Sequence, residues 1–478
     1  MRTVLNLLIL LLLAGCAAPK QQDPVKEINK EIAAGNFTRA AELVDSLVAG
    51  GQIGELQQRN LLFIRDSLHR VKLDFNKTKE EIVEWIENNR LFTPSDSLID
   101  RWELSKALEC RVIDGEKRYF RNAAPNLFRV DASARELSPV SPPSSDVPRD
   151  ALLIGAFNHK ISSDTKGKYL LPEKKMKARY TLTVNADAVP EGELLKVWLP
   201  FPRKDIDRQT NVELLATSQP DYILSDDKMA HTSLYMEQKA VAGEPTVFWI
   251  DFQFTSRGEW FDLSEIAPTP YDKSSALFRT YTAEQKPHIG FSPTIQALTD
   301  SITRNAETPV EILQAAYRYI ASNYPWASAL EYSTIANIPE YVIENRKGDC
   351  GQVALLLITM LRYKGVPARW QSGWMTHPGE VNLHDWAEVY FEGTGWVPVD
   401  ISFGRGPEVP IQPGREFFMS GIDSYRLYIN SGFSGEFYPP KKYPRSETVD
   451  FQRGEVESGP WNLYFDQWRY RMELTYNN

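Results

Sequence analysis

A cysteine, a histidine and an aspartate lie in three segments whose patterns could bring them together. Cys350 follows Lys347-Gly348-Asp349 and opens an apolar run that ends near Tyr363, so a helix is predicted to begin at the cysteine. A thiol at a helix N-terminus feels the positive end of the helix dipole, which lowers its pKa and favours the nucleophilic thiolate. The alternative is that Cys350 is a small buried core residue, as most free cysteines are.

His384 and Asp400 belong to a predicted β-hairpin. Residues 382–391 have the pattern of a strand, residues 392–395 that of a turn, and residues 395–400 that of the returning strand. His384 heads the first strand and Asp400 ends the second, so both are expected at the open end of the hairpin. A histidine that takes a thiol proton and is oriented by an aspartate is the arrangement of a catalytic triad.

Four motifs in this region resemble those of the transglutaminase-like superfamily. They are Gly-Asp-Cys-Gly, Gly-Val-Pro-Ala-Arg, His-Asp-Trp-Ala-Glu-Val-Tyr and Gly-Trp-Val-Pro-Val-Asp, in this order over roughly residues 305–404. The resemblance implies a papain-like α+β core in which Cys350 is the nucleophile, His384 the base and Asp400 the orienting acid. It does not choose a reaction, because the superfamily includes cross-linking enzymes, proteases, peptide N-glycanases and inactive members.

Other polar and aromatic residues of this region have weaker assignments. The same resemblance implies that an aromatic or amide side chain upstream of the cysteine could help to hold an oxyanion, and Trp326, Tyr324 and Gln314 are the candidates. Packing is the expected role of each, and the backbone N–H of Cys350 is the favoured donor. His377 is expected in an exposed loop near the cleft. No group of His, Cys and carboxylate residues in the sequence has metal-ligand spacing, so neither a metal nor another cofactor is expected.

The first residues predict a lipid anchor. Arg2 and the apolar run from Val4 to Leu13 match a signal segment that is too short to remain as a membrane-spanning helix. Leu13-Ala14-Gly15-Cys16 is similar to the bacterial lipobox, which implies that Cys16 is acylated, for example with palmitate. A plain secretory signal is the alternative. We therefore expect a bacterial cell-envelope protein anchored through Cys16, with the outer membrane favoured and the side it faces left open.

The remaining pattern predicts a multidomain α+β protein. Helical periodicity fills the N-terminal part and is interrupted at Gly35-Asn36, a Pro/Ser-rich segment follows, and alternation with a period of two begins near Lys177. Cys110 is expected to lie in a helix at residues 100–112 and to be buried in the core of the protein. Whether the last strands complete a sheet or wall the cleft is left open. The expected segments are a signal peptide at 1–15, a tether at 16–23, a helical domain at 24–130, a linker at 131–174, a β-sandwich at 175–285, the catalytic domain at 286–440 and C-terminal strands at 441–478.

Charge and motifs together favour an enzyme that acts on peptides. The formal net charge of −9 argues against a nucleic-acid partner. The leading hypothesis is a lipid-anchored cysteine enzyme that hydrolyses peptide or amide bonds through a thioester intermediate. The alternatives are a protein cross-linking transglutaminase and an inactive binding or scaffold lipoprotein. The expected partners are a protein or peptide substrate, the membrane through the anchor, and a partner protein on the helical domain.

Overall fold

The computed structural model describes residues 24–477 apart from 52, 141–146, 407–411 and 460, so the predicted signal peptide, the tether and Cys16 lie outside the described residues. The chain forms two compact units. One holds the described residues up to Leu68 together with Val112–Glu116, and the other holds His69–Arg111 with everything from Lys117 onward. None of the described helices combines the length and apolarity that a membrane span requires.

The first unit contains a helical hairpin, as Gly35-Asn36 predicts. Helix α1 (Pro24–Ala33) and helix α2 (Phe37–Ala49) are joined at Gly35, whose φ of +82° suits a residue without a Cβ. The backbone N–H and the hydroxyl of Thr38 donate to the carboxylate of Asp114 at 2.8 and 2.7 Å, which ties α2 to the turn at residues 112–116.

The predicted helix through Cys110 is wrong, because Cys110 begins a strand. Helix α5 (Asp96–Leu104) ends early, and Lys106 takes a left-handed conformation with φ of +59° that no helix continues through. Asp114 and Gly115 both have positive φ and form the tight turn between two short strands. The predicted linker also holds helices. The elements of this region are α3 (Glu55–Asp74), α4 (Lys79–Arg90), β1 (Cys110–Ile113), β2 (Glu116–Tyr119), α6 (Ala123–Val130), α7 (Ala132–Leu137) and α8 (Val147–Asn158).

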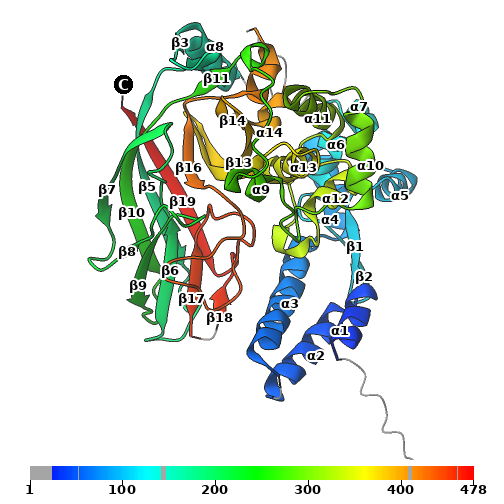
Figure 1. Ribbon diagram of the computed structural model, residues 1–478. Helices are drawn as coiled ribbons and strands as arrows, with labels where there is room; N and C mark the ends of the chain where they lie inside the picture. Colours follow the sequence, from blue (N-terminus) through cyan, green and yellow to red (C-terminus); the bar gives the residue numbers. More distant parts are fainter. Residues whose placement is uncertain (1–23, 52, 141–146, 407–411, 460, 478) are drawn as a thin grey trace, which may run out of the picture. The chain divides into compact units, whose positions relative to one another are not determined.

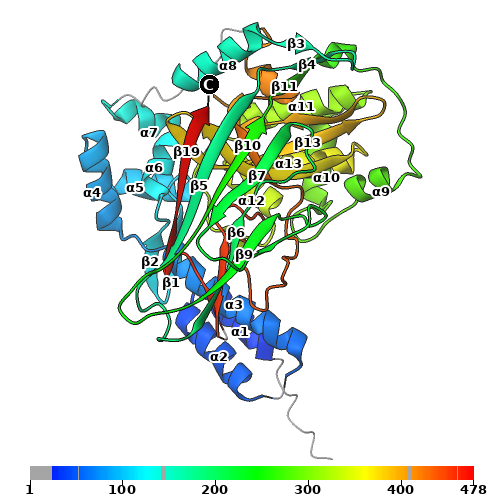
Figure 2. The same cartoon turned by 90° about the vertical axis from the view of Figure 1, so that its left-hand side faces the viewer.

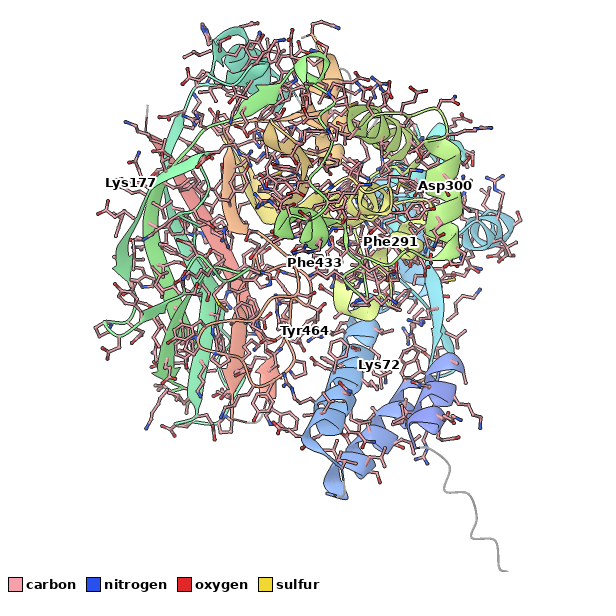
Figure 3. The ribbon with its side chains drawn as sticks, viewed as in Figure 1. Lys72, Lys177, Phe291, Asp300, Phe433 and Tyr464 are labelled. Atoms are coloured by element: carbon pink, nitrogen blue, oxygen red, sulfur yellow. The ribbon has the colours of Figure 1, made fainter. Side chains whose placement is uncertain are left out.

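The predicted β-sandwich exists, and the C-terminal strands complete it. One sheet has the order β19-β5-β10-β7 and faces the viewer in Figure 2, and the other has the order β18-β17-β6-β9-β8. Strand β19 pairs with β5 along its whole length, from Trp468↔Val184 to Asn477↔Lys175. Side chains from both sheets fill the space between them (Figure 3), with Tyr180, Trp198 and Phe252 among the fully buried ones. The strands are β5 (Lys174–Val184), β6 (Leu194–Pro200), β7 (Gln209–Thr217), β8 (Ile223–Leu224), β9 (Ser233–Lys239), β10 (Thr246–Ser256), β17 (Glu455–Ser458), β18 (Trp461–Leu463) and β19 (Trp468–Asn477).

The region predicted as the catalytic core lies between β10 and β17 in the sequence. A sheet of order β14-β13-β12-β16 carries helix α13 (Cys350–Tyr363) against β12 and β13 (Figure 1). A small sheet has the order β15-β11-β4-β3 and combines two strands from before β5, one from directly after β10 and one from between β14 and β16. The remaining elements are β3 (Ile161–Ser162), β4 (Lys168–Leu170), β11 (Glu259–Phe261), α9 (Ala276–Thr282), α10 (Pro293–Ile302), α11 (Pro309–Asn323), α12 (Ile338–Asn345), β12 (Ala368–His377), β13 (Glu380–Phe391), β14 (Gly395–Val399), α14 (Ile401–Gly404), β15 (Gly421–Ile422) and β16 (Arg426–Asn430).

Candidate active site

Helix α13 begins at Cys350 because the residues around it form a capping box. The carboxylate of Asp349 accepts the N–H of Gln352 at 3.0 Å, and the Gln352 side chain accepts the N–H of Asp349 at 3.1 Å. Cys350 is therefore the first residue of the helix, where a backbone N–H has no partner inside the helix. Gly351 follows because a Cβ there would overlap the Tyr332 hydroxyl and lie 2.7 Å from Asp385 Oδ2.

The hairpin brings His384 and Asp400 together, as its pattern predicts. Nε2 of His384, on β13, lies 2.7 Å from Oδ2 of Asp400, which directly follows β14. Both side chains are buried, and the ring of Phe403 lies 4.9 Å from the imidazole ring. The pair can hold the imidazole in one tautomer, with a proton on Nε2.

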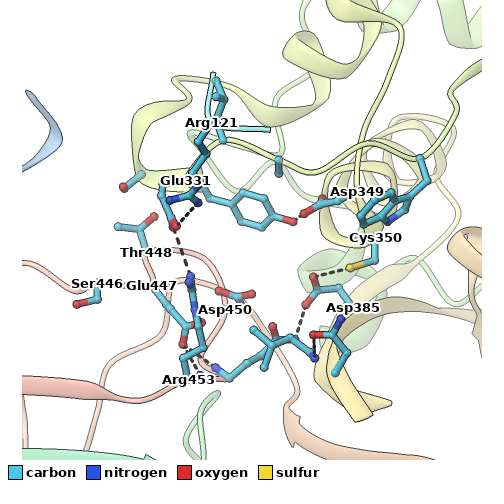
Figure 4. Close-up of a pocket in the computed structure, with 18 residues that line it drawn as sticks. Arg121, Glu331, Asp349, Cys350, Asp385, Ser446, Glu447, Thr448, Asp450 and Arg453 are labelled. Carbon is cyan, nitrogen blue, oxygen red and sulfur yellow. Dashed lines mark hydrogen bonds and ion pairs between the residues drawn. The ribbon is translucent and has the colours of Figure 1, made fainter. Parts of the chain in front are cut away.

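The thiol makes its hydrogen bond elsewhere. Sγ of Cys350 lies 3.4 Å from Oδ2 of Asp385, the residue after His384 on β13 (Figure 4). Successive side chains of a strand alternate between its faces, and Asp385 is the one that meets the start of α13. Among the described residues the thiol has no hydrogen bond to the His384 imidazole. Two of the three predicted residues are thus paired, and the third is held by a neighbour that the sequence did not single out.

The predicted lowering of the thiol pKa is wrong for this arrangement. Burial raises the pKa of Cys350 well above its ordinary value, and the carboxylates of Asp385 and Asp349 raise it further. A helix dipole contributes about 2 kcal/mol at most, whereas burial next to two carboxylates disfavours a second negative charge more strongly. The thiol is therefore protonated at neutral pH in this structure.

The imidazole is neutral in the same structure. Burial lowers the pKa of His384, and the partly compensating effect of Asp400 does not restore it. Burial alone would raise the pKa of Asp400, but His384 and Arg426 outweigh it and keep this pKa below its ordinary value. His384 is thus an uncharged base beside an ionised carboxylate.

Arg426 extends the pair into a buried network. Its guanidinium donates to Asp400 at 2.9 Å and to Asp423 at 2.7 Å. Asp423 in turn lies 3.1 Å from Nε2 of His377. The prediction of an exposed loop for His377 is wrong, because this side chain is buried at the end of β12 and faces Phe403.

A cavity of about 240 Å³ opens beside the thiol (Figure 4). Of the three oxyanion candidates only Trp326 lines it, whereas Gln314 lines a different cavity and Tyr324 is buried at the end of α11. The lining is Arg121, Trp326, Ala329, Leu330, Glu331, Tyr332, Ser333, Asp349, Cys350, Asn382, Leu383, Asp385, Ser446, Glu447, Thr448, Asp450, Gln452 and Arg453.

Several of these residues carry no local signal in the sequence. Gln452 donates to Asp385 Oδ1 and to the His384 carbonyl oxygen, both at 2.8 Å, and it comes from the loop before β17. For Asp385 the one signal in the sequence is its position directly after His384.

Cys110 and Cys350 are both free thiols, and the described residues contain no group of His, Cys, Asp and Glu that could hold a metal ion.

Comparisons with known proteins agree with the motifs. Residues 296–401 match the family model of the transglutaminase-like superfamily. The protein YebA of Bacillus subtilis is 25% identical over 129 residues, which cover 23% of this chain and 17% of YebA. A protein-glutamine gamma-glutamyltransferase of Pseudomonas aeruginosa is 27% identical over 146 residues, which cover 28% of this chain and 22% of the enzyme. The chain thus spans about a fifth of the length of these curated relatives.

Solved structures give more distant likenesses. A proposed cysteine protease from Cytophaga hutchinsonii has 14% identity and a TM-score of 0.43, over 65% of this chain and 93% of that one. The periplasmic domain of TgpA from Pseudomonas aeruginosa has 17% identity and a TM-score of 0.27, over 48% of this chain and 88% of that one. On the family model and the motifs within it, the chain contains a domain of the transglutaminase-like superfamily at residues 296–401.

Proposed function

We propose that this protein is a cysteine enzyme that hydrolyses peptide or amide bonds, with Cys350 as nucleophile, His384 as base and Asp400 as the residue that orients it. The observation that carries the proposal is the buried hydrogen bond of 2.7 Å between His384 and Asp400, one strand position from the residue that holds the thiol. The cavity beside the thiol supplies room for a substrate.

The reaction begins when the thiol turns from Asp385 to His384. The imidazole takes the thiol proton, the sulfur forms a bond to the amide carbonyl carbon, and the backbone N–H of Cys350 donates to the oxyanion. The C–N bond then breaks, and the imidazolium gives its proton to the leaving nitrogen. Water, deprotonated by His384, attacks the thioester, and the released thiolate recovers the proton, so that acid and amine are the products.

Transfer to an amine is the second candidate. A relative named as a protein-glutamine gamma-glutamyltransferase favours it, since the same thioester can be opened by a primary amine in place of water. Hydrolysis remains the leading proposal because water is always present.

The test uses the purified protein, a library of peptides and peptide amides, and mass spectrometry of the intact protein. Wild type is expected to release amine and to accumulate a thioester that hydroxylamine removes. Cys350→Ala should form no adduct, Asp400→Asn should lose about 10³–10⁴-fold in kcat by analogy with other triads, and the matched control Cys110→Ala should retain activity. Supplying a primary amine separates the two candidates, because a transferase forms the amide product and a hydrolase does not. Turnover that survives Cys350→Ala contradicts the proposal.

We also propose that Cys16 carries the lipid that anchors the protein to the bacterial envelope. The support is the sequence Leu13-Ala14-Gly15-Cys16 after an apolar run. Growth with an alkyne-tagged palmitate should label the wild type and not Cys16→Ser. Equal labelling of both, or of neither, contradicts this proposal without affecting the catalytic one.

A further inference from the structure

The cavity beside Cys350 has apolar walls and an acidic interior. Trp326, Leu330 and Leu383 supply apolar surface, and five carboxyl groups and two guanidinium groups also line the cavity. Figure 4 shows most of the charged side chains directed toward one another across it. Its charge balance decides which ligands it suits.

Both guanidinium groups are already paired. Arg121 lies 3.2 Å from Glu331, and Arg453 lies 3.4 Å from Glu331 and 2.7 Å from Glu447. The carboxylate of Asp349 accepts the Tyr332 hydroxyl at 2.6 Å in addition to its helix-capping bond. These contacts satisfy three of the five carboxyl groups, which leaves Asp385 and Asp450.

Asp385 and Asp450 have no ion-pair partner among the described residues. Within the described ranges the Asp385 side chain accepts only from the thiol of Cys350 and from Gln452, which are both uncharged donors. Asp450 is 8% exposed, lines the cavity, and accepts no hydrogen bond from another side chain in the described part of the chain. A buried carboxylate without an ion-pair partner is costly, so a cavity that holds two such groups is suited to a cation.

The protonation of the two groups agrees with this need for positive charge. Burial raises the pKa of Asp385, and the neighbouring Asp450 raises it further. Burial also raises the pKa of Asp450, followed by Glu447, and the guanidinium groups of Arg453 and Arg445 lower it without overcoming burial. A cation that binds between the two carboxyl groups would replace the proton that they hold.

We propose that this cavity binds a primary ammonium group of the peptide that donates the acyl group, between Asp385 and Asp450. The inference rests on the proposed function and adds a substrate class to it. The apolar walls suit the alkyl part of a chain that ends in an ammonium group, and two sources share this chemistry: a lysine-like side chain and a free peptide N-terminus.

The contacts of the thiol assign the ammonium group to the acyl donor. Asp385 holds Cys350 before any acylation, so a cation that occupies Asp385 frees the thiol to turn to His384. The second substrate, water or an amine, enters only after the thioester has formed, which is too late to release the thiol. Ammonium binding would thus precede and promote the first chemical step.

The experiment compares matched peptides on the full-length protein. One pair carries lysine or norleucine next to the scissile amide with an acetylated N-terminus, and a second pair has a free or an acetylated N-terminus without lysine. Hydrolysis by wild type gives kcat/KM, and fluorescence anisotropy with Cys350→Ala gives binding. The test variant is Asp450→Asn. The matched control is Asp300→Asn, on α10 (Figure 3), which removes a carboxylate that pairs with Lys364 and does not line the cavity.

We expect at least one pair to favour the charged peptide about tenfold or more in both assays, the lower end for close charge pairs at desolvated interfaces. Asp450→Asn should remove this preference and Asp300→Asn should keep it. A thermal melt shows whether Asp450→Asn folds. If it does not, the ratio of kcat/KM for the charged peptide to that for the neutral peptide, measured on wild type, decides. Equal hydrolysis of charged and neutral peptides overturns the inference and leaves the proposed function standing. Charge-selective binding without hydrolysis keeps the cation site and overturns the proposed function.

Discussion

The contact between Cys350 and Asp385 makes the reactivity of the thiol depend on one carboxyl group. Two full charges at 3.4 Å interact by about 5 kcal/mol at an effective dielectric constant of ~20, so an ionised Asp385 adds strongly to the effect of burial, and both raise the pKa of the thiol. Burial and the neighbouring Asp450 raise the pKa of Asp385, so its mean charge is smaller. We therefore expect Asp385→Asn, which keeps the shape and removes the charge, to lower the pKa of Cys350.

The assay is alkylation of Cys350 by iodoacetamide between pH 5 and 10, with peptide mass mapping. In the wild type the midpoint should lie above the ordinary thiol value of about 8.5, and in Asp385→Asn it should move down. Cys110 provides an internal reference in every sample, and Asp300→Asn controls for the loss of a surface charge.

Two results would refute this reasoning. A wild-type midpoint well below 8.5 would mean that the helix dipole or His384 dominates, as the sequence alone suggests. An unchanged midpoint in Asp385→Asn would mean that burial alone sets the pKa of the thiol.

Three further predictions concern stability and are measured by urea unfolding. Arg426→Met leaves the buried carboxylates of Asp400 and Asp423 without their common partner and should destabilise the protein by about 3–5 kcal/mol. The control Arg179→Met, in an exposed pair with Asp251, should cost less than about 1 kcal/mol. Equal losses of stability in the two variants would contradict the network. Burial raises the pKa of Asp74 to about 7, so the folded state binds more protons than the unfolded state, and stability should fall as pH rises from about 4 to 7. Asp74→Asn should flatten that slope, and an unchanged slope would exclude Asp74 as its source. A Cβ on Gly373 would overlap the Leu427 carbonyl oxygen, so Gly373→Ala should separate β12 from β16 and lower the stability. The control is Gly155→Ala on α8, where a Cβ meets nothing within 4 Å, and it should be neutral or stabilising by up to about 1 kcal/mol. A Gly373→Ala variant as stable as the wild type would contradict the close approach of the two strands.

The parts of the site that could be predicted are those fixed by local patterns. The capping side chains of Asp349 and Gln352 determine where α13 begins, and the tight turn at residues 392–395 brings His384 and Asp400 together. These relations involve residues that are close in the sequence or joined by one hairpin.

The parts that could not be predicted depend on which strand face meets which helix. Asp385 contacts the thiol because it points toward α13, and the sequence pattern of β13 does not state which face that is. Asp450 and Arg426 reach the site from segments far along the chain. The error at Cys110 has another cause, because a left-handed Lys106 interrupts a pattern that otherwise suits a helix.

The pairing of β19 with β5 and of β17 with β6 makes the transglutaminase-like region an insertion within the sandwich. During synthesis on the ribosome, β5 and β6 emerge first, and they lack their partner strands β19 and β17 until the transglutaminase-like region between them has been made. An interrupted chain would expose the edges of both sheets, which invite pairing with other chains. The sandwich is therefore sealed only when β17 and β19 pair with β6 and β5, and the cavity beside Cys350, which is lined from the loop before β17, is complete only at that point.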